Sequence, residues 1–419
     1  MSKGVQKMSW QKHAFDGRSD GPMQGVRVID LSRLVAGNMT SLQLADFGAD
    51  VIKVEPLPLG DPLRAWKQGG ISTFWTVYGR NKRSIGLDFR KEGAIELLKR
   101  LIATADILIE SFRPGTLEKM GLGPEVLHEV SPKLIILRVS GFGQSGPYSS
   151  RPGFGTLVEG MSGFASRNGE EGGDPLLPPL ALADMIAGLY GSNALLMALR
   201  SRATSGKGQV IDLALLDAMT SVLGPEALDY QLLHKPKPRV GNGSNTSSPR
   251  NVYQTSDGGF IALSASMQKT AERVFRCIGR EDLITHPDFC TNEQRVARRH
   301  AVDQIVGGWI GERTMEEGLA IFDEHGITAA PVYDIEDISK DQHFRKRGIY
   351  VELPDDDLGG AAMHAPVPRL LSTPGGFHRA APRISEHARQ ILTEAGFDDA
   401  EFTALLESEL ISESVHDNK

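Results

Sequence analysis

The first 140 residues alternate short apolar runs with amphipathic segments. The apolar runs predict buried strands at residues 26–31, 50–55, 84–89, 106–111 and 133–140. Between them, the segment 91–105 places Ile95, Leu98, Leu101 and Ile102 on one helical face. The remaining predicted helices lie at residues 36–48, 114–121 and 123–130. Strands that alternate with helices predict an α/β fold with a parallel sheet covered on both faces.

The pattern changes further along the chain. Residues 182–209 predict one long helix, and residues 210–219 predict a strand followed by a helix. The stretch 230–250 is rich in Pro, Gly and Ser and reads as a linker. Residues 251–266 predict a hairpin that turns at Ser256–Gly259, and helical segments follow to about residue 327. A smaller middle domain is therefore expected inside a larger α/β domain that ends in amphipathic helices.

Composition narrows the function classes. The 419 residues have a formal net charge of −7 and no dense basic cluster, so we expect no nucleic-acid partner. Cys277 and Cys290 do not form a C-x-x-C motif. Two thiols that need not pair suit a reducing, cytoplasmic location. The sequence contains no run of 18 apolar residues, so we expect no membrane span. Residues 1–22 have no apolar signal-peptide core, and we expect them to form a flexible tail.

A glycine-rich stretch, "SGFGQSGP" at residues 140–147, follows the predicted strand 133–140. Its G-x-G-x-x-G spacing is typical of dinucleotide-binding loops, which would make the protein an NAD-dependent oxidoreductase. Such a loop must lead into a helix whose N-terminus holds the pyrophosphate. Here "PYSSRPGFG" follows, and its prolines and glycines disfavour a helix. The alternative is a loop that needs close backbone approach or positive φ.

Two other kinds of site lack their signatures. Pro147 stands where a serine-hydrolase elbow of the G-x-S-x-G type needs glycine. The eleven histidines form neither H-E-x-x-H nor H-x-x-E-H, so we expect no catalytic metal.

Asp184 is the most informative single residue. It opens the long predicted helix and is the only charge in "LALADMIAGL". Ala187, Gly188 and Gly191 follow it, small residues that would let a bulky ligand approach the backbone. A carboxylate in this setting either caps the helix N-terminus or acts as a nucleophile towards an acyl group. The residues alone leave both readings open.

Several stretches, in this order and spacing, resemble the class III CoA-transferases. This is the family of formyl-CoA transferase, carnitine CoA-transferase and α-methylacyl-CoA racemase. The resemblance covers residues 24–412 and rests on "GVRVIDLSRLVAG", "ADFGADVIKVEPLPLGDPLR", "SGFGQSGPY", "ALADMIAGLYG", "SGKGQVIDLALLDAM" and "APRISEH".

The resemblance implies an architecture. A large Rossmann-like domain would comprise residues 23–225 and, after a small α+β domain with linkers at 226–335, a return segment and C-terminal helices at 336–419. Two chains would interlock as a homodimer. Acyl-CoA would be a substrate, and no cofactor would be bound permanently.

The resemblance also assigns the site. The nucleophile of the family falls on Asp184. The positions that contact CoA fall on Val35, Ala36, Leu87, Arg90, Ser111, Phe112, Arg113, Lys119 and Arg151. The implied activity is transfer of CoA from an acyl-CoA to a carboxylic acid, through an aspartyl anhydride and an aspartyl-CoA thioester.

Two departures separate the chain from other branches of the family. The histidine and aspartate that serve as bases in the racemase align with Phe154 and Gly155, and phenylalanine carries no proton. A racemase is therefore the weaker alternative. Gly155 also replaces an acidic residue of formyl-CoA transferase. Arg250 and Asn251 are candidates to bind the second carboxylate of a diacid acceptor such as succinate.

Overall fold

The protein forms two compact units in a computed structural model that describes residues 10–17 and 20–414. The first unit comprises Met1–Ser162, Pro178–Gly224 and Gln342–Lys419, and the second comprises Gly163–Leu177 and Pro225–Asp341. The family resemblance implies that residues 163–177 belong to the large domain, but in the structure they are part of the second unit. There Gly241 donates a backbone hydrogen bond to Gly169, and Arg299 pairs with Glu171.

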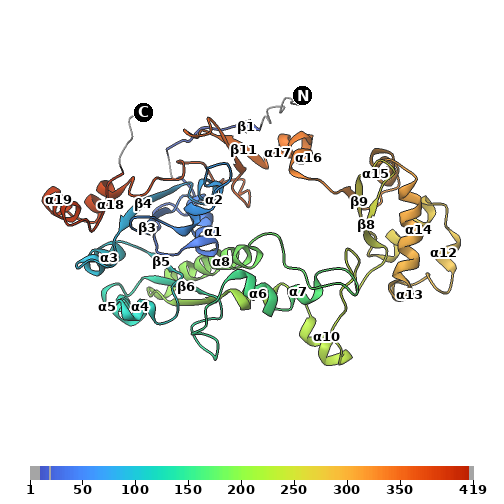
Figure 1. Ribbon diagram of the computed structural model, residues 1–419, viewed down its shortest axis with the longest axis horizontal. Coiled ribbons are helices and arrows are strands. Elements are labelled where there is room, and N and C mark those ends of the chain that lie inside the picture. Colours follow the sequence, from blue (N-terminus) through green and yellow to red (C-terminus); the bar gives the residue numbers. More distant parts are fainter. Residues whose placement is uncertain (1–9, 18–19, 415–419) are drawn as a thin grey trace. The chain divides into compact units, whose positions relative to one another are not determined.

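A six-stranded parallel sheet organises the first unit, as the alternating pattern predicts (Figure 1). Its strand order is β4-β3-β2-β5-β6-β7. The strands are β2 (Arg27–Asp30), β3 (Asp50–Pro56), β4 (Lys82–Leu87), β5 (Ile107–Glu110), β6 (Ile135–Ser140) and β7 (Val210–Ala214). The chain order reverses between β2 and β5, so the carboxyl ends of these two strands flank the crevice where such sheets bind ligands.

Helices cover both faces of this sheet. Side chains of alternating strand residues, such as Ile29, Ile52 and Leu108, pack with helices that include α3, α18 and α19. On the opposite face α1 packs along α8. The helices of this unit are α1 (Leu34–Ala45), α2 (Thr73–Tyr78), α3 (Ala94–Ala103), α4 (Thr116–Lys119), α5 (Pro124–Val130), α6 (Gly155–Met161), α8 (Leu182–Ser205), α9 (Leu215–Ser221), α17 (Gln342–Arg347), α18 (Ala388–Glu394) and α19 (Asp399–Glu407), with a 3-10 turn at Pro62–Ala65.

The sequence predicts a flexible tail at residues 1–22, but part of this segment is a strand. β1 (Gln11–Lys12) pairs in parallel with β11 (Tyr350–Leu353), which pairs with β12 (Ala361–His364). Trp10 is buried and its ring lies 5.3 Å from that of Tyr350, which anchors the segment. Residues 1–9 and 18–19 lie outside the described residues.

The second unit has a small antiparallel sheet and its own core. β8 (Arg250–Gln254) and β9 (Phe260–Ser264) form the predicted hairpin, and β10 (Ala329–Pro331) pairs with β9. Apolar side chains from these strands and from helices such as α11, α14 and α15 form the core. The helices are α7 (Phe164–Arg167), α10 (Glu226–Leu233), α11 (Gln268–Cys277), α12 (Asp282–Thr285), α13 (Asn292–Ala297), α14 (Arg299–Gly311), α15 (Met315–Glu324) and α16 (Ile335–Lys340).

The helix α8 has the length and mean hydropathy of a membrane span, which the count of consecutive apolar residues did not reveal. The small residues Ala187, Gly188 and Gly191 on one side of it are buried, and this side packs on α1. Contact with α1 thus accounts for the small residues of α8, while 33% of its apolar window is buried in the single chain.

Candidate active site

Asp184 lies in the first turn of α8 but is not its N-cap. The helix begins at Leu182, and the capping position belongs to Ala181, which makes no side-chain hydrogen bond. The capping interpretation of Asp184 is therefore wrong, because the carboxylate lies inside the helix. The positive end of the helix dipole still favours an anion at this place.

A cavity of about 330 Å³ opens in front of the Asp184 carboxylate. Its wall combines the turns that follow β2, β5 and β6 with the start of α8, so it occupies the crevice at the reversal of strand order. The lining residues are Arg33, Leu34, Ala36, Pro62, Ser111, Arg113, Val139, Ser140, Gly141, Pro152, Gly153, Phe154, Asp184 and Leu215. This volume suits the reacting ends of small substrates.

The electrostatics of Asp184 are unusual for an aspartate. Burial and the nearby charge of Glu159 raise the pKa of Asp184 to about 6, while the backbone N–H groups of Ala36 and of Asp184 itself oppose the shift. The carboxylate is therefore ionised above neutral pH and more basic than an exposed aspartate. A raised pKa in a cavity is typical of catalytic carboxylates.

Two residues of α6 are neighbours of Asp184, and one of them, Glu159, escaped the sequence reasoning. Glu159 is 2% exposed, and its Oε1 accepts a hydrogen bond of 3.1 Å from the backbone N–H of Ala183. Gly155 packs so closely that a Cβ atom there would lie 2.1 Å from Asp184 Oδ2. The only available signal for Glu159 was its being the single charge between Arg151 and Arg167.

The turn between β2 and α1 forms the wall opposite α8. Leu34 has a φ of 62°, a strained value for a residue with a branched side chain. Its N–H donates to Asp61 Oδ1 at 3.0 Å, and the buried Lys53 ammonium lies 3.1 Å from the other oxygen of Asp61. Burial alone would raise the pKa of Asp61, but Lys53 and the N–H donors outweigh it, so this pKa is lowered. An ionised Asp61 thus holds the turn in place.

The small residues after Asp184 serve a different purpose from the predicted one. A Cβ atom on Gly188 would lie 2.6 Å from Met39 and 2.9 Å from the carbonyl oxygen of Ala36. A Cβ atom on Gly191 would lie 2.6 Å from Thr40 Oγ1. These glycines therefore make room for α1, not for a ligand. The close packing brings the Ala36 N–H to Asp184.

The glycine-rich stretch 140–147 is a loop, and the next helix begins only at Gly155. Gly143 and Gly146 have φ values of 88° and 87°, and Gly141 packs on Gly153, where an added Cβ would lie 2.7 Å from the Gly153 Cα. The glycines serve turns and a backbone crossing, and no helix N-terminus follows to hold a pyrophosphate. The dinucleotide interpretation therefore lacks its defining element.

The structure brings some of the predicted CoA contacts together. Ala36, Ser111 and Arg113 line the cavity of Asp184, and Ser111 Oγ accepts a hydrogen bond from the Arg33 N–H at 3.0 Å. Val35 and Phe112 adjoin these positions but do not line the cavity, because Val35 is buried and Phe112 packs against the sheet core.

The other predicted contacts lie elsewhere. Arg90 lines a separate cavity of about 650 Å³ beside α19 and forms a bidentate pair with Asp88. Leu87 is fully buried at the end of β4. Lys119 is exposed, and the exposed Arg151 stacks on the Tyr148 ring at 3.9 Å.

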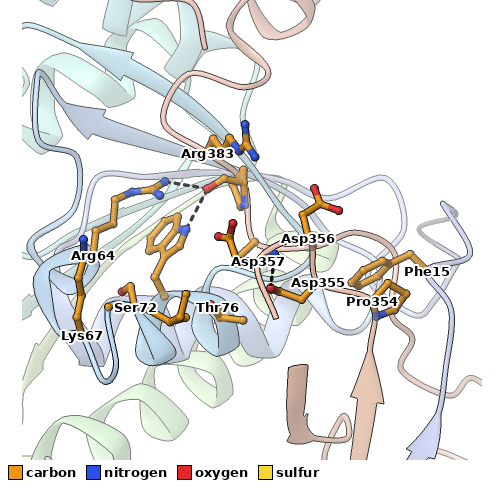
Figure 2. A pocket seen from close by; sticks show the side chains of 16 residues that line it. Phe15, Arg64, Lys67, Ser72, Thr76, Pro354, Asp355, Asp356, Asp357 and Arg383 are labelled. Carbon is orange, nitrogen blue, oxygen red and sulfur yellow. Dashed lines mark hydrogen bonds between the residues drawn. The ribbon is translucent and has the colours of Figure 1, made fainter. Parts of the chain in front are cut away.

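Another cavity, of about 500 Å³, contains none of the predicted site residues (Figure 2). Figure 2 shows Arg64 and Lys67 on one side and Asp355, Asp356 and Asp357 on the other. The Arg64 guanidinium is already bound by Glu55 and by the carbonyl oxygen of Pro382. The predicted site residues that the structure brings together thus lie at the Asp184 cavity and not at this one.

Arg250 and Asn251, the candidates to bind a second carboxylate, do not line the cavity of Asp184. The Arg250 guanidinium donates to the backbone carbonyls of Asn242 and Gly243, and the Asn251 amide donates to Asp303. Both side chains are engaged in the structure of their own unit. Within residues 10–17 and 20–414, no group of three His, Cys, Asp or Glu side chains is arranged to hold a metal ion.

Comparison with known proteins gives consistent results. The sequence profile described as CoA-transferase family III matches residues 23–388. Succinyl-CoA–D-citramalate CoA-transferase of Chloroflexus aurantiacus is 36% identical over 380 residues, which cover 90% of this chain and 94% of the relative. Succinate–glutarate CoA-transferase of Agrobacterium fabrum is 35% identical, with coverages of 89% and 95%. The crystal structure of a CaiB/BaiF family protein from Brucella suis superimposes with a TM-score of 0.78 at 33% identity, covering 90% of this chain and all of the other.

Proposed function

As the chain belongs to CoA-transferase family III and is an acyl-CoA:carboxylate CoA-transferase, we propose that Asp184 is the nucleophile that carries the acyl group. The observation that supports this most is the position of the Asp184 carboxylate. It is partly buried, it lines a cavity at the sheet crevice, and its pKa is raised to about 6. Such a carboxylate is ionised at neutral pH and weakly solvated, which favours attack on an acyl carbon.

The transfer takes four displacements. An oxygen of Asp184 attacks the thioester carbon, the C–S bond breaks, and CoA leaves as the thiolate, which gives a mixed anhydride. The thiolate then attacks the aspartyl carbonyl carbon and releases the donor acid as a carboxylate. The acceptor carboxylate attacks the aspartyl-CoA thioester and again expels the thiolate. The thiolate finally attacks the acceptor acyl carbon, which yields the new acyl-CoA and restores Asp184.

The cavity supports these steps in two ways. Confinement keeps the thiolate beside the anhydride, which makes its recapture effectively unimolecular. The N–H of Ala36, already directed at Asp184, can stabilise the oxyanion that forms when the aspartyl carbonyl is attacked. Replacement of Asp184 by Asn should lower the transfer rate at least about 10³-fold. An Asp184→Asn variant with near-normal turnover would contradict the assignment.

The acceptor that we propose is a small dicarboxylate, with succinyl-CoA as donor. Two similar proteins are named for succinyl-CoA or succinate and a second diacid. In this chain, Arg33 and Arg113 line the cavity and are exposed, so one guanidinium can bind the carboxylate that does not react. The phosphates of CoA need cations as well, and the arginine that serves the acceptor must be distinguished by kinetics.

A panel of monoacids and diacids, assayed with succinyl-CoA by mass spectrometry, tests the acceptor class. Diacids should give the higher kcat/KM. Arg33→Gln and Arg113→Gln should differ, because the variant that loses the acceptor contact raises KM for diacids about tenfold or more and leaves KM for succinyl-CoA near normal. Product from monoacids only would reject the diacid proposal.

We also propose that the enzyme is a homodimer of interlocked chains. Leu189, Leu196 and Met197 of α8 are 49%, 49% and 63% exposed in the single chain. Apolar side chains exposed together on one helix are typical of a protein interface.

A cytoplasmic location is proposed from Cys277 and Cys290, which are both free. Fractionation of the source cells tests the location.

A racemase remains the weaker alternative. Phe154 is 60% exposed at the cavity wall and Gly155 faces the Asp184 carboxylate, so neither position provides a base. Exchange of the α-hydrogen of a branched acyl-CoA with deuterium from D₂O would be the evidence for it.

A further inference from the structure

The buried carboxylate of Glu159 is hydrogen-bonded to the backbone of Ala183, the residue that precedes Asp184. Its side chain is 2% exposed, and Oε1 accepts the hydrogen bond from the Ala183 N–H. No ion pair with Glu159 occurs among residues 10–17 and 20–414. A buried carboxylate without a cation is costly, and a glutamine amide would make the same hydrogen bond without the charge. The fold therefore accounts for the hydrogen bond but not for the charge.

The other groups around Asp184 do not neutralise Glu159. The helix α1, which packs along α8, contains no charged residue. The remaining charged or titratable groups on the packed elements are engaged elsewhere, exposed, or on the open side of the cavity. They are Arg138 of β6, bound to Glu110 and Glu118; Asp212 of β7, bound to the Gln144 N–H; Asp217 of α9, which is exposed; Tyr78 of α2, which contacts Met185; Tyr190 of α8, which accepts a hydrogen bond from Ser221; Arg200 of α8, which is exposed; Arg202 of α8, bound to Asp106; and Arg33 and Arg113 at the cavity.

We propose that Glu159 is a positioning residue whose fixed negative charge makes Asp184 a stronger nucleophile for acyl transfer. The proposal rests on the proposed role of Asp184. In the first displacement the new C–O bond forms as the C–S bond breaks, and the negative charge leaves Asp184 with the CoA thiolate. Before this step both Asp184 and Glu159 carry negative charge near the first turn of α8, and after it only Glu159 does. The repulsion between them therefore raises the energy of the free enzyme relative to the anhydride and thioester intermediates.

Glu159→Gln tests this directly, because it keeps the acceptor for the Ala183 N–H and removes the charge. In the wild type, kcat/KM should fall below about pH 6 as Asp184 becomes protonated. In Glu159→Gln this acid limb should move to lower pH by about one unit. At pH 8, kcat should fall about threefold, since nucleophilicity follows a fraction of the change in pKa.

Matched variants separate charge from packing. Glu159→Asp keeps the charge and should retain the acid limb of the wild type. Asp217→Asn removes an exposed carboxylate from α9, which also packs on α6, and should leave the whole profile unchanged. An acid limb in Glu159→Gln that matches the wild type would overturn the proposal.

Stability measurements exclude a purely structural role. Since Glu159→Gln removes a buried charge, the variant should unfold at the same or higher urea concentration than the wild type at pH 8. A destabilised or unfolded Glu159→Gln variant would show that the charge serves the fold, and would also overturn the proposal. Acyl labelling of Asp184 in the wild type keeps the two ideas distinct. Absence of the label refutes the nucleophile, whereas labelling with an unshifted acid limb refutes only the role of Glu159.

Discussion

Gly155 shows how little space surrounds the reactive carboxylate. An alanine methyl group would lie 2.1 Å from Asp184 Oδ2, so Asp184 would have to move. Phe154, the preceding residue, lines the same cavity. At these two positions the chain thus provides space and an apolar wall, and the proposed nucleophile comes from α8.

Gly155→Ala should therefore lower kcat about 100-fold, because a nucleophile displaced by about 1 Å loses its alignment. Gly160→Ala in the same helix is the matched control, since no atom lies within 4 Å of the added methyl group. The control should keep full activity and gain up to about 1 kcal/mol in helix stability. Equal activity of both variants in steady-state assays would contradict the described packing.

Asp184→Asn should stabilise the protein while it abolishes transfer. The pKa of Asp184 is about 6 in the folded protein, above its ordinary value of 3.8, so the folded state binds this proton more tightly. The stability contributed by protonation is full below about pH 4 and is lost as the pH rises to about 6. At pH 8 the neutral variant should exceed the wild type by up to about 3 kcal/mol.

Urea denaturation at two pH values checks this stability difference. The gain should be present at pH 8 and should nearly vanish at about pH 3, below the ordinary pKa of 3.8, where Asp184 is mostly neutral in both the folded and the unfolded state. A variant that is less stable than the wild type at pH 8 would show that the ionised carboxylate supports the fold.

Sequence reasoning found Asp184 because one charge in a long apolar segment is conspicuous and because the surrounding motif resembles a family. It missed Glu159, since a single glutamate in "GTLVEGM" has no distinguishing spacing. Its importance depends on α6 packing against α8, which is a tertiary contact. Ala36, Ser111 and Arg113 line the cavity of Asp184, and their contact with CoA stays a prediction, whereas Arg250 and Asn251 use their polar atoms within their own unit.

At the scale of elements, α1 and α8 position the site together. Gly188 and Gly191 allow the two helices to approach closely, and Thr40 Oγ1 donates a hydrogen bond of 3.1 Å to the carbonyl oxygen of Gly188. The sequence showed these small residues but not their partner. A stripe of small residues indicates a close contact, and only the fold shows whether a helix or a ligand fills it.

Gly188→Ala should cost about 1–3 kcal/mol, because the methyl group would lie 2.9 Å from a backbone oxygen that cannot turn aside. Gly308→Ala in α14 is the control, with open space around the methyl group. Thermal unfolding should show a lower midpoint for the first variant only. Since the Ala36 turn would shift, kcat should fall as well; unchanged stability and activity would argue against the described contact.

At the scale of the whole molecule, the strand order β4-β3-β2-β5-β6-β7 explains where the site lies. The alternation of strands and helices predicted the parallel sheet. It could not predict the reversal of strand order, which depends on long-range pairing between β2 and β5. The reversal brings the turn at Leu34 and the segment at Ser111 to one cavity, although 77 positions separate them in the sequence.

The proposed interlocking of two chains would have a kinetic consequence. Threaded chains separate only after one of them unfolds, so two differently tagged dimers should not exchange subunits in native buffer. Mixed dimers should appear after unfolding in urea and refolding together. Native mass spectrometry measures both. A dimer that exchanges subunits within minutes in native buffer would be ordinary, and a monomer at micromolar concentration would refute the dimer itself.

The most direct test of the central claim is to identify the residue that carries the acyl group during turnover. The enzyme is incubated with succinyl-CoA, trapped with hydroxylamine and digested, and the peptides are mapped by mass spectrometry. The account predicts a hydroxamate on Asp184 in the wild type and none in Asp184→Asn. A hydroxamate on another residue, or none at all in an enzyme that is turning over, would contradict it.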